Sequence, residues 1–135
     1  MKKSILLLVA LAFVTIGYSQ EIIHLDDNSF KENVWNYQKN KDWKYEGNKV
    51  AIVDFYADWC GPCKMIAPHL KDLQKEYGKD IQVYKVNTDE HGNLAGLFGI
   101  RGIPTLILVS SDGTYKKLVG YRSKEQLKKI IDEAM

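Results

Sequence analysis

Short apolar runs along the chain predict five β-strands. Residues 50–57 form the most continuous of these runs, which indicates a central strand buried on both faces. The other strand-like runs are shorter and cover residues 22–25, 81–86, 105–109 and 115–119. A Ser111-Asp112-Gly113-Thr114 turn joins the last two strands as a hairpin.

Helical spacing and capping residues predict four helices between these strands. Residues 60–77 form the longest helix, which Gly78 ends. Its apolar stripe is expected to contain Met65, Ile66, Leu70, Leu73 and Tyr77. Capping boxes predict a first helix from Ser29, with Glu32, to about Tyr37, and a last helix that starts at Ser123, with Gln126. A short helix is expected over residues 93–98.

The resulting order is β-α-β-α-β-α-β-β-α, which is typical of an α/β fold with a central mixed sheet flanked by helices. Strands that alternate with helices pair in parallel through right-handed crossovers, and the final hairpin adds an antiparallel edge. A chain of 135 residues supports one compact domain. Residues 38–49 are polar and show no periodicity, so they are expected to form a loop.

The first 19 residues have the composition of a secretory signal peptide. Lys2 and Lys3 precede an apolar run over residues 5–16, and small residues follow at Gly17 and Ser19. This run is shorter than the about 20 residues of a membrane-spanning helix, although an uncleaved N-terminal anchor is the alternative. We expect cleavage after Ser19, which leaves residues 20–135 as the mature domain in a periplasmic or other extracytoplasmic place.

Removal of that segment changes the charge of the chain. The basic residues fall from 19 to 17 when Lys2 and Lys3 are lost, and they then equal the 17 acidic residues. The chain also has no dense basic stripe interleaved with aromatic residues. Nucleic-acid binding therefore has little support.

Cys60 and Cys63 are the two cysteines of the chain and lie at the predicted start of the long helix. A disulfide that closes so short a loop removes little chain entropy, so a structural staple is a poor explanation. A helix N-terminus stabilises a thiolate, which is the reactive form in disulfide exchange, and the two sulfurs share one side of the first turn. Pro62 suits a first turn, and Gly61 allows a substrate chain to approach closely.

Zinc binding and inert burial are the alternatives for the cysteine pair. Cys-x-x-Cys is half of a zinc site, but a closed site needs two more ligands, and His24, His69 and His91 show no paired spacing. Inert buried thiols would favour an apolar setting away from a helix start. We expect a redox-active Cys60–Cys63 disulfide, no metal and no further cofactor.

Two motifs resemble the signature segments of the thioredoxin family: VDFYADWCGPCK at residues 53–64 and GIRGIPT at residues 99–105. The resemblance covers residues 21–135 and implies the thioredoxin fold and thiol–disulfide exchange. It implies that Cys60 is the nucleophile and Cys63 the resolving thiol. Asp54 matches a buried carboxylate that takes a proton from the resolving cysteine, and Lys85 matches its partner. A purely structural Asp54–Lys85 ion pair is the alternative.

The resemblance also implies a substrate-binding surface. Pro104 matches a cis-proline that faces the disulfide, and Ile103 would offer its backbone to an extended substrate segment. The remaining residues of this surface would be Trp59, Gly61, Pro62, Gly102, Val119 and Gly120. For Trp59 and Val119 the alternative is packing in the core. Pro68, inside the long helix, also matches the family and is interpreted as architectural.

Two features depart from the family pattern. Tyr56 stands where many thioredoxins have tryptophan. The connection that contains residues 38–49 is longer than the minimal one by about ten residues, which a polar loop tolerates at little entropic cost. It is either decoration or a contact surface for a dedicated partner, through Trp43 and Tyr45.

The expected function is reduction of disulfides in substrate proteins. Gly61 and Pro62 between the cysteines resemble the reductant branch of the family, whereas oxidants and isomerases usually carry a histidine there. A reductant in an oxidising compartment would need electrons from a membrane-embedded thiol donor, and the mature domain is expected to be a soluble monomer. The alternatives are a disulfide oxidase or isomerase, a reductase dedicated to cytochrome maturation, and a non-redox binding module or chaperone.

Overall fold

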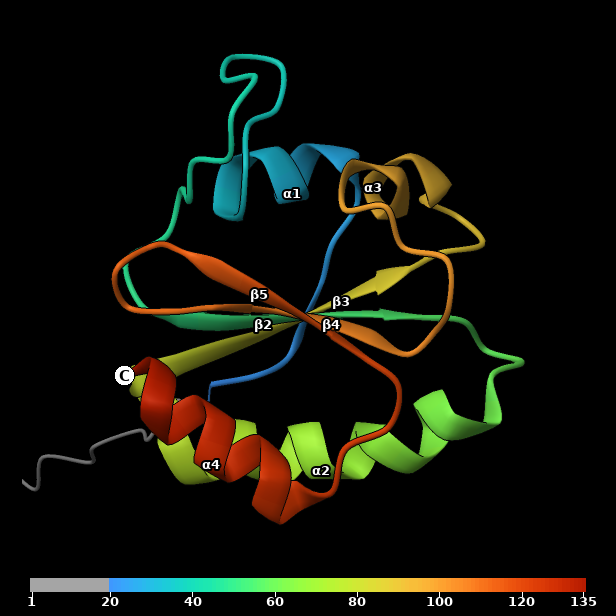
Figure 1. Cartoon of the computed structure of the whole chain (residues 1–135), viewed down its shortest axis with the longest axis vertical. Coiled ribbons are helices and arrows are strands. Elements are labelled where there is room, and N and C mark those ends of the chain that lie inside the picture. The colour runs from blue at the N-terminus through green and yellow to red at the C-terminus, as the bar shows by residue number, and fades with distance from the viewer. Residues whose placement is uncertain (1–19) are drawn as a thin grey trace, which may run out of the picture.

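The computed structural model describes residues 20–135, which form one five-stranded mixed sheet with helices on both faces (Figure 1). The predicted signal peptide, residues 1–19, lies outside the described residues. In their order across the sheet the strands are β1 (Ile23–His24), β3 (Ile81–Asn87), β2 (Val50–Tyr56), β4 (Thr105–Val109) and β5 (Tyr115–Val119). The first three are parallel, and β4 and β5 form an antiparallel hairpin beside β2. The predicted α/β class is confirmed.

Within residues 20–135, two helices cover each face of the sheet. In Figure 1, α1 (Asp27–Asn33) and α3 (Gly92–Leu97) lie on one face, and α2 (Gly61–Tyr77) and α4 (Lys124–Ala134) lie on the other. One 3₁₀ turn, η1 (Gly78–Asp80), leads from α2 into β3.

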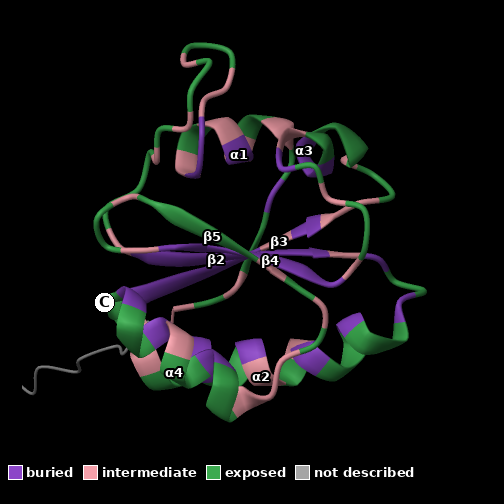
Figure 2. Ribbon diagram, in the orientation of Figure 1, coloured by how far each residue is buried: buried purple, intermediate pink, exposed green. Residues whose placement is uncertain are grey.

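Strand β2 is buried on both faces, as its continuous apolar pattern predicts (Figure 2). Its alternate side chains enter two different cores, because successive residues of a strand point to opposite faces. Val53 and Phe55 pack in the core beneath α1 and α3. Val50 and Ile52 pack in the core beneath α2 and α4. Asp54 and Tyr56 therefore project on the α2 side.

The start of α1 differs from the prediction. Asp26, rather than Ser29, is the N-cap: its Oδ1 accepts a hydrogen bond from the Ser29 amide at 2.8 Å, and the Asp26 amide donates to Ser29 Oγ at 2.9 Å. The Ser29 bonds hold the pKa of Asp26 below its usual value. The helix ends at Asn33 instead of near Tyr37. The chain then turns away, and the carbonyl of Val34 accepts from the amide of Glu46.

The apolar stripe of α2 is narrower than predicted. Ile66, Leu70 and Leu73 are buried, but Met65 is 59% exposed. Neighbouring residues of a helix are about 100° apart, so Met65 cannot share the inward direction of Ile66. The last helix does begin with the predicted capping box of Ser123 and Gln126.

The loop of residues 38–49 is attached to the β4–β5 hairpin through Trp43. The indole Nε1 of Trp43 donates to the Gly113 carbonyl at 2.7 Å. Its ring lies 4.7 Å from that of Tyr115 and 5.6 Å from that of Trp35, measured between centroids. The rings of Trp43 and Tyr45 are parallel. The aromatic residues of the loop therefore make contacts within the chain.

Candidate active site

Cys60 and Cys63 form a disulfide at the start of α2, with 5.3 Å between their Cα atoms. Cys60 is the N-cap of this helix, and its Sγ accepts a hydrogen bond from the Cys63 amide at 3.2 Å. Both cysteines are largely buried, whereas Gly61 and Pro62 between them are exposed. The Cys63 amide and the positive end of the helix dipole lie beside the Cys60 sulfur, so this position favours a thiolate once the disulfide is reduced.

Two distant loops lie next to the disulfide. The Ile103 carbonyl oxygen is 3.8 Å from Cys60 Sγ, and the Ile103–Pro104 peptide bond is cis, as the family resemblance implies. Gly120, after β5, donates its amide to the Pro104 carbonyl at 2.8 Å. Gly120 has a φ of 87°, a value that suits glycine because it has no Cβ. The Gly102 carbonyl accepts a hydrogen bond from Thr105 Oγ1.

Exposed apolar side chains occur at this end of the sheet. Trp59 is 70% exposed and Val119 is 56% exposed, so neither packs in the core. An open groove extends beside Trp59 and is lined by Thr88, Ala95, Ile100, Arg101, Gly102 and Ile103. The protein thus leaves apolar surface uncovered around a disulfide, which is the kind of surface a substrate chain can cover.

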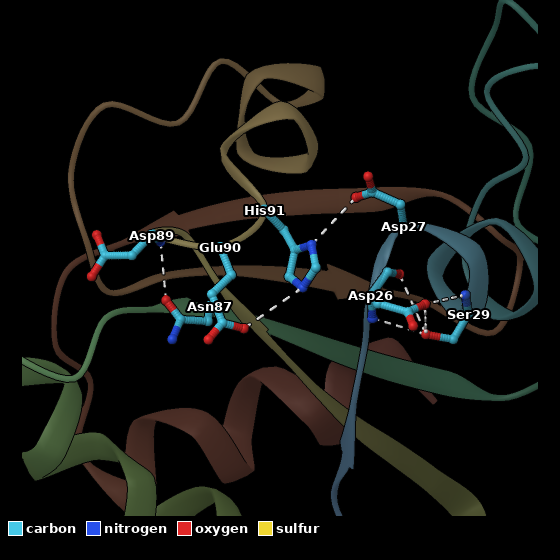
Figure 3. Close-up of polar contacts among 7 residues, drawn as sticks. All are labelled: Asp26, Asp27, Ser29, Asn87, Asp89, Glu90 and His91. Carbon is cyan, nitrogen blue, oxygen red and sulfur yellow. Dashed lines mark hydrogen bonds and ion pairs between the residues drawn. The ribbon is translucent and has the colours of Figure 1, made fainter.

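The loop after β3 orients Trp59. The indole Nε1 of Trp59 donates to Asp89 Oδ2 at 3.0 Å. Figure 3 shows how this loop is held: the Asp89 amide donates to Asn87 Oδ1, and the His91 ring lies between Asp27 and Glu90. No sequence motif points to Asp89, because its role depends on a contact across 30 positions.

Asp54 is completely buried in β2, and no hydrogen-bond donor from residues 20–135 reaches either of its carboxylate oxygens. Burial raises the pKa of its carboxyl to about 6, and the nearby Lys85 ammonium acts in the opposite direction. Lys85 Nζ lies 3.9 Å from Asp54 Oδ2, which is an ion-pair distance and too long for a hydrogen bond. The expected proximity of Asp54 and Lys85 is therefore present.

Lys85 has a second neighbour that the sequence does not single out for this contact. Its Nζ lies 4.2 Å from the centroid of the Tyr56 ring, within the range of a cation–π interaction. Burial, with the negative charges of Asp58, Glu90 and Asp54, raises the pKa of the Tyr56 hydroxyl. The sequence marks Tyr56 only as a departure from the family pattern.

Residues 20–135 match neither of two further patterns, a metal-binding cluster and a membrane-spanning helix. In this range no cluster of three or more His, Cys, Asp or Glu side chains is arranged to hold a metal ion. Nor does any helix of the described part have the length and apolar character needed to cross a membrane.

Comparison with known proteins gives consistent matches to thioredoxins. The Thioredoxin family model matches residues 21–133. A thioredoxin of Borreliella burgdorferi is 37% identical over 111 residues, which cover 82% of this chain and 95% of that relative. A thioredoxin of Alicyclobacillus acidocaldarius is 45% identical over 90 residues, which cover 67% of this chain and 86% of that relative.

Two solved structures also resemble this chain. A mutant thioredoxin from Halobacterium salinarum NRC-1 has a TM-score of 0.68 and 32% identity, with 86% of this chain and 92% of that chain covered. Chloroplastic thioredoxin z has a TM-score of 0.72 with 84% and 94% covered, and its 22% identity makes this a likeness of fold alone.

Proposed function

This chain belongs to the thioredoxin family and is a protein-disulfide reductase with a redox-active disulfide, and from that premise we propose that Cys60 attacks the substrate and Cys63 resolves the product. The observation that carries this assignment is the position of Cys60 as the N-cap of α2. The helix N-terminus stabilises a thiolate there more than at Cys63, which lies inside the first turn.

The reaction moves two electrons from the dithiol to a substrate disulfide. The Cys60 thiolate attacks one substrate sulfur, a mixed disulfide forms, and the other substrate sulfur leaves as a thiolate. The Cys63 thiol then loses its proton to the Asp54 carboxylate and attacks Cys60 Sγ. The first substrate sulfur leaves as the second thiolate, and the Cys60–Cys63 disulfide is formed.

Asp54 can take this proton only when it is ionised. Its burial, without a hydrogen-bond donor from the described residues, makes the charged form unfavourable, and a pKa of about 6 leaves the carboxyl both ionised and basic near neutral pH. The proton-transfer role supports a further expectation: the resolving step should slow as the pH falls below about 6.

The substrate segment is proposed to lie in an extended form across the loops beside the disulfide. The Ile103 backbone would pair with it in the manner of an added strand. Apolar side chains of the substrate segment would cover Trp59 and Val119, which are otherwise exposed to solvent. Gly61, Gly102 and Gly120 have no Cβ and would let the substrate backbone approach closely, and the exposed Pro62 would lie beside it.

The trapping experiment uses Cys63→Ser with a protein substrate that contains a disulfide. This variant should accumulate a mixed disulfide through Cys60, because no second thiol can release the product. Cys60→Ser is the matched control and should trap nothing. Full turnover by Cys63→Ser would contradict the assignment of roles.

The reduction potential of the Cys60–Cys63 pair tests the direction of the reaction. A value of about −270 mV favours reduction, and a value well above it favours the oxidase or isomerase alternative.

We further propose an extracytoplasmic place of action, with electrons supplied by a membrane-embedded thiol donor. The support is the basic, apolar and small-residue pattern of residues 1–19. Cell fractionation with N-terminal sequencing tests this. The expected result is a mature chain that starts at Gln20 outside the cytoplasm, and a full-length chain confined to the cytoplasm would contradict it.

A further inference from the structure

Four side chains lie in register across the sheet on the α2 side. His24 of β1 is opposite Lys85 of β3, Lys85 is opposite Asp54 of β2, and Asp54 is opposite Leu106 of β4. Partner residues in neighbouring strands project on the same face. Tyr56, two residues after Asp54, also projects on this face. Asp54 is therefore flanked by Lys85 on one strand and by an apolar residue on the other.

The position of Lys85 matters because, among the described residues, its ammonium is the one cation paired with Asp54. Neither oxygen of Asp54 accepts a hydrogen bond from the part of the chain that the structure describes, and the attraction of Lys85 acts across 3.9 Å. The Lys85 side chain remains 16% exposed, so its flexible stem gives the ammonium a route toward water. The Tyr56 ring, 4.2 Å from Nζ, opposes that movement because its π face attracts the cation.

Tyr56 is itself held in place. Thr88, after β3, donates both its amide and its hydroxyl to the Tyr56 carbonyl, at 2.8 Å and 3.0 Å. The His24 ring meets the Tyr56 ring edge-on, with 6.3 Å between centroids. The charged groups near Tyr56 are Asp58 and Glu90, besides Lys85 and Asp54. In the described chain, the buried residues of α2 and α4 on this side add no charge.

We propose that Tyr56 is a positioning residue, whose ring keeps the Lys85 ammonium beside Asp54 and so favours the ionised form of that carboxyl. This inference rests on the proposed function, in which ionised Asp54 accepts the proton of Cys63. It also implies that tyrosine at position 56, where many thioredoxins have tryptophan, changes how the ammonium is held. Tryptophan has the strongest cation–π attraction of the aromatic residues, so tyrosine at this position holds the ammonium less tightly.

The test is a titration of the Asp54 carboxyl by ¹³C NMR in the oxidised protein, where no thiol titrates. Tyr56→Leu should raise the Asp54 pKa by roughly half a pH unit, because the ammonium is no longer held near the carboxyl. Tyr56→Phe keeps the ring and should leave the pKa unchanged. Tyr56→Trp should lower it. These opposite directions keep the test decisive even if the leucine variant folds poorly.

The second arm repeats the comparison with Lys85→Met. Tyr56→Leu should then have no effect on the Asp54 pKa, because no ammonium remains to be positioned. A shift that persists with Lys85→Met, a shift to lower pH, or the absence of any shift in Tyr56→Leu would overturn the inference. A shift to lower pH would indicate that removal of the ring admits water. The absence of any shift would indicate that the ring only packs.

The titration is independent of the proposed function. It measures the Asp54 carboxyl without any substrate, so it stands whether or not that carboxyl takes part in turnover. Turnover of Asp54→Asn provides the separate measurement. An unchanged rate and pH profile in Asp54→Asn would remove the proton role of Asp54 and leave the contact between Tyr56 and Lys85 untouched.

Discussion

Asp54 brings a negative charge into the core whenever it ionises. Burial raises the pKa of its carboxyl from 3.8 to about 6, even though the Lys85 ammonium opposes this shift. Between those two pH values the folded protein holds a proton that the unfolded chain has already released. The contribution of Asp54 to stability therefore falls as the pH rises from 3.8 to about 6, and this penalty stays constant at higher pH.

Replacing this carboxyl by an amide should remove the penalty. We expect Asp54→Asn to raise the free energy of unfolding at about pH 8 by up to about 3 kcal/mol, since one pKa unit corresponds to about 1.4 kcal/mol. The gain should shrink on acidification and vanish near about pH 4. Urea unfolding of the oxidised protein at several pH values measures it, with the exposed Asp58→Asn as the control. A gain independent of pH would contradict the account.

Among the secondary-structure elements, the helix starts show what sequence spacing can and cannot decide. Ser29 with Glu32 and Asp26 with Ser29 both have capping-box spacing, and the structure selects the second pair. The choice depends on the strand before it: β1 ends at His24, and Leu25 donates its amide to the Lys85 carbonyl, so the chain is free to turn at Asp26. That tertiary constraint has no local sequence signal.

The corrected cap gives an element-scale prediction. Asp26→Ala should lower the melting temperature by a few degrees, because the Ser29 amide loses its acceptor at the start of α1. Glu32→Ala is the matched control and should have a much smaller effect. The effect of Asp26→Ala should also fade in acid, since its carboxylate is protonated there. Thermal unfolding followed by circular dichroism makes the comparison, and a larger loss in Glu32→Ala would favour Ser29 as the cap.

The active site likewise contains residues that local sequence motifs predict and residues that only tertiary contacts bring in. Local motifs are enough to predict Cys60, Cys63 and the loop of Pro104, because each lies in a segment whose chemistry is readable within a few residues. Asp89 and the contact of Tyr56 with Lys85 are not predicted. They join β2 or the turn after it to residues about thirty positions later, and only the pairing of β2 with β3 brings them together.

On the scale of the whole molecule, the two ends of the sheet carry different features. Phe55 near the end of β2 is paired with Thr105, and Thr105 with Val119, so this end lies beside the disulfide loops. At the opposite end Val109 is paired with Tyr115, and the loop of Trp43 packs there. The longer loop is thus separated from the cysteines by the length of β2.

This separation predicts opposite effects for two tryptophans. Trp43→Ala should destabilise the fold by about 2–3 kcal/mol, because a partly buried ring is lost from an aromatic cluster. Disulfide reduction by the folded Trp43→Ala protein should be unchanged. Trp59→Ala should change stability by only about 0.5 kcal/mol, since that ring is 70% exposed, but should slow substrate reduction several-fold. Urea unfolding and turnover of a protein disulfide, measured on both variants, test the pair. Slower reduction by fully folded Trp43→Ala would mean that the loop takes part in substrate binding after all.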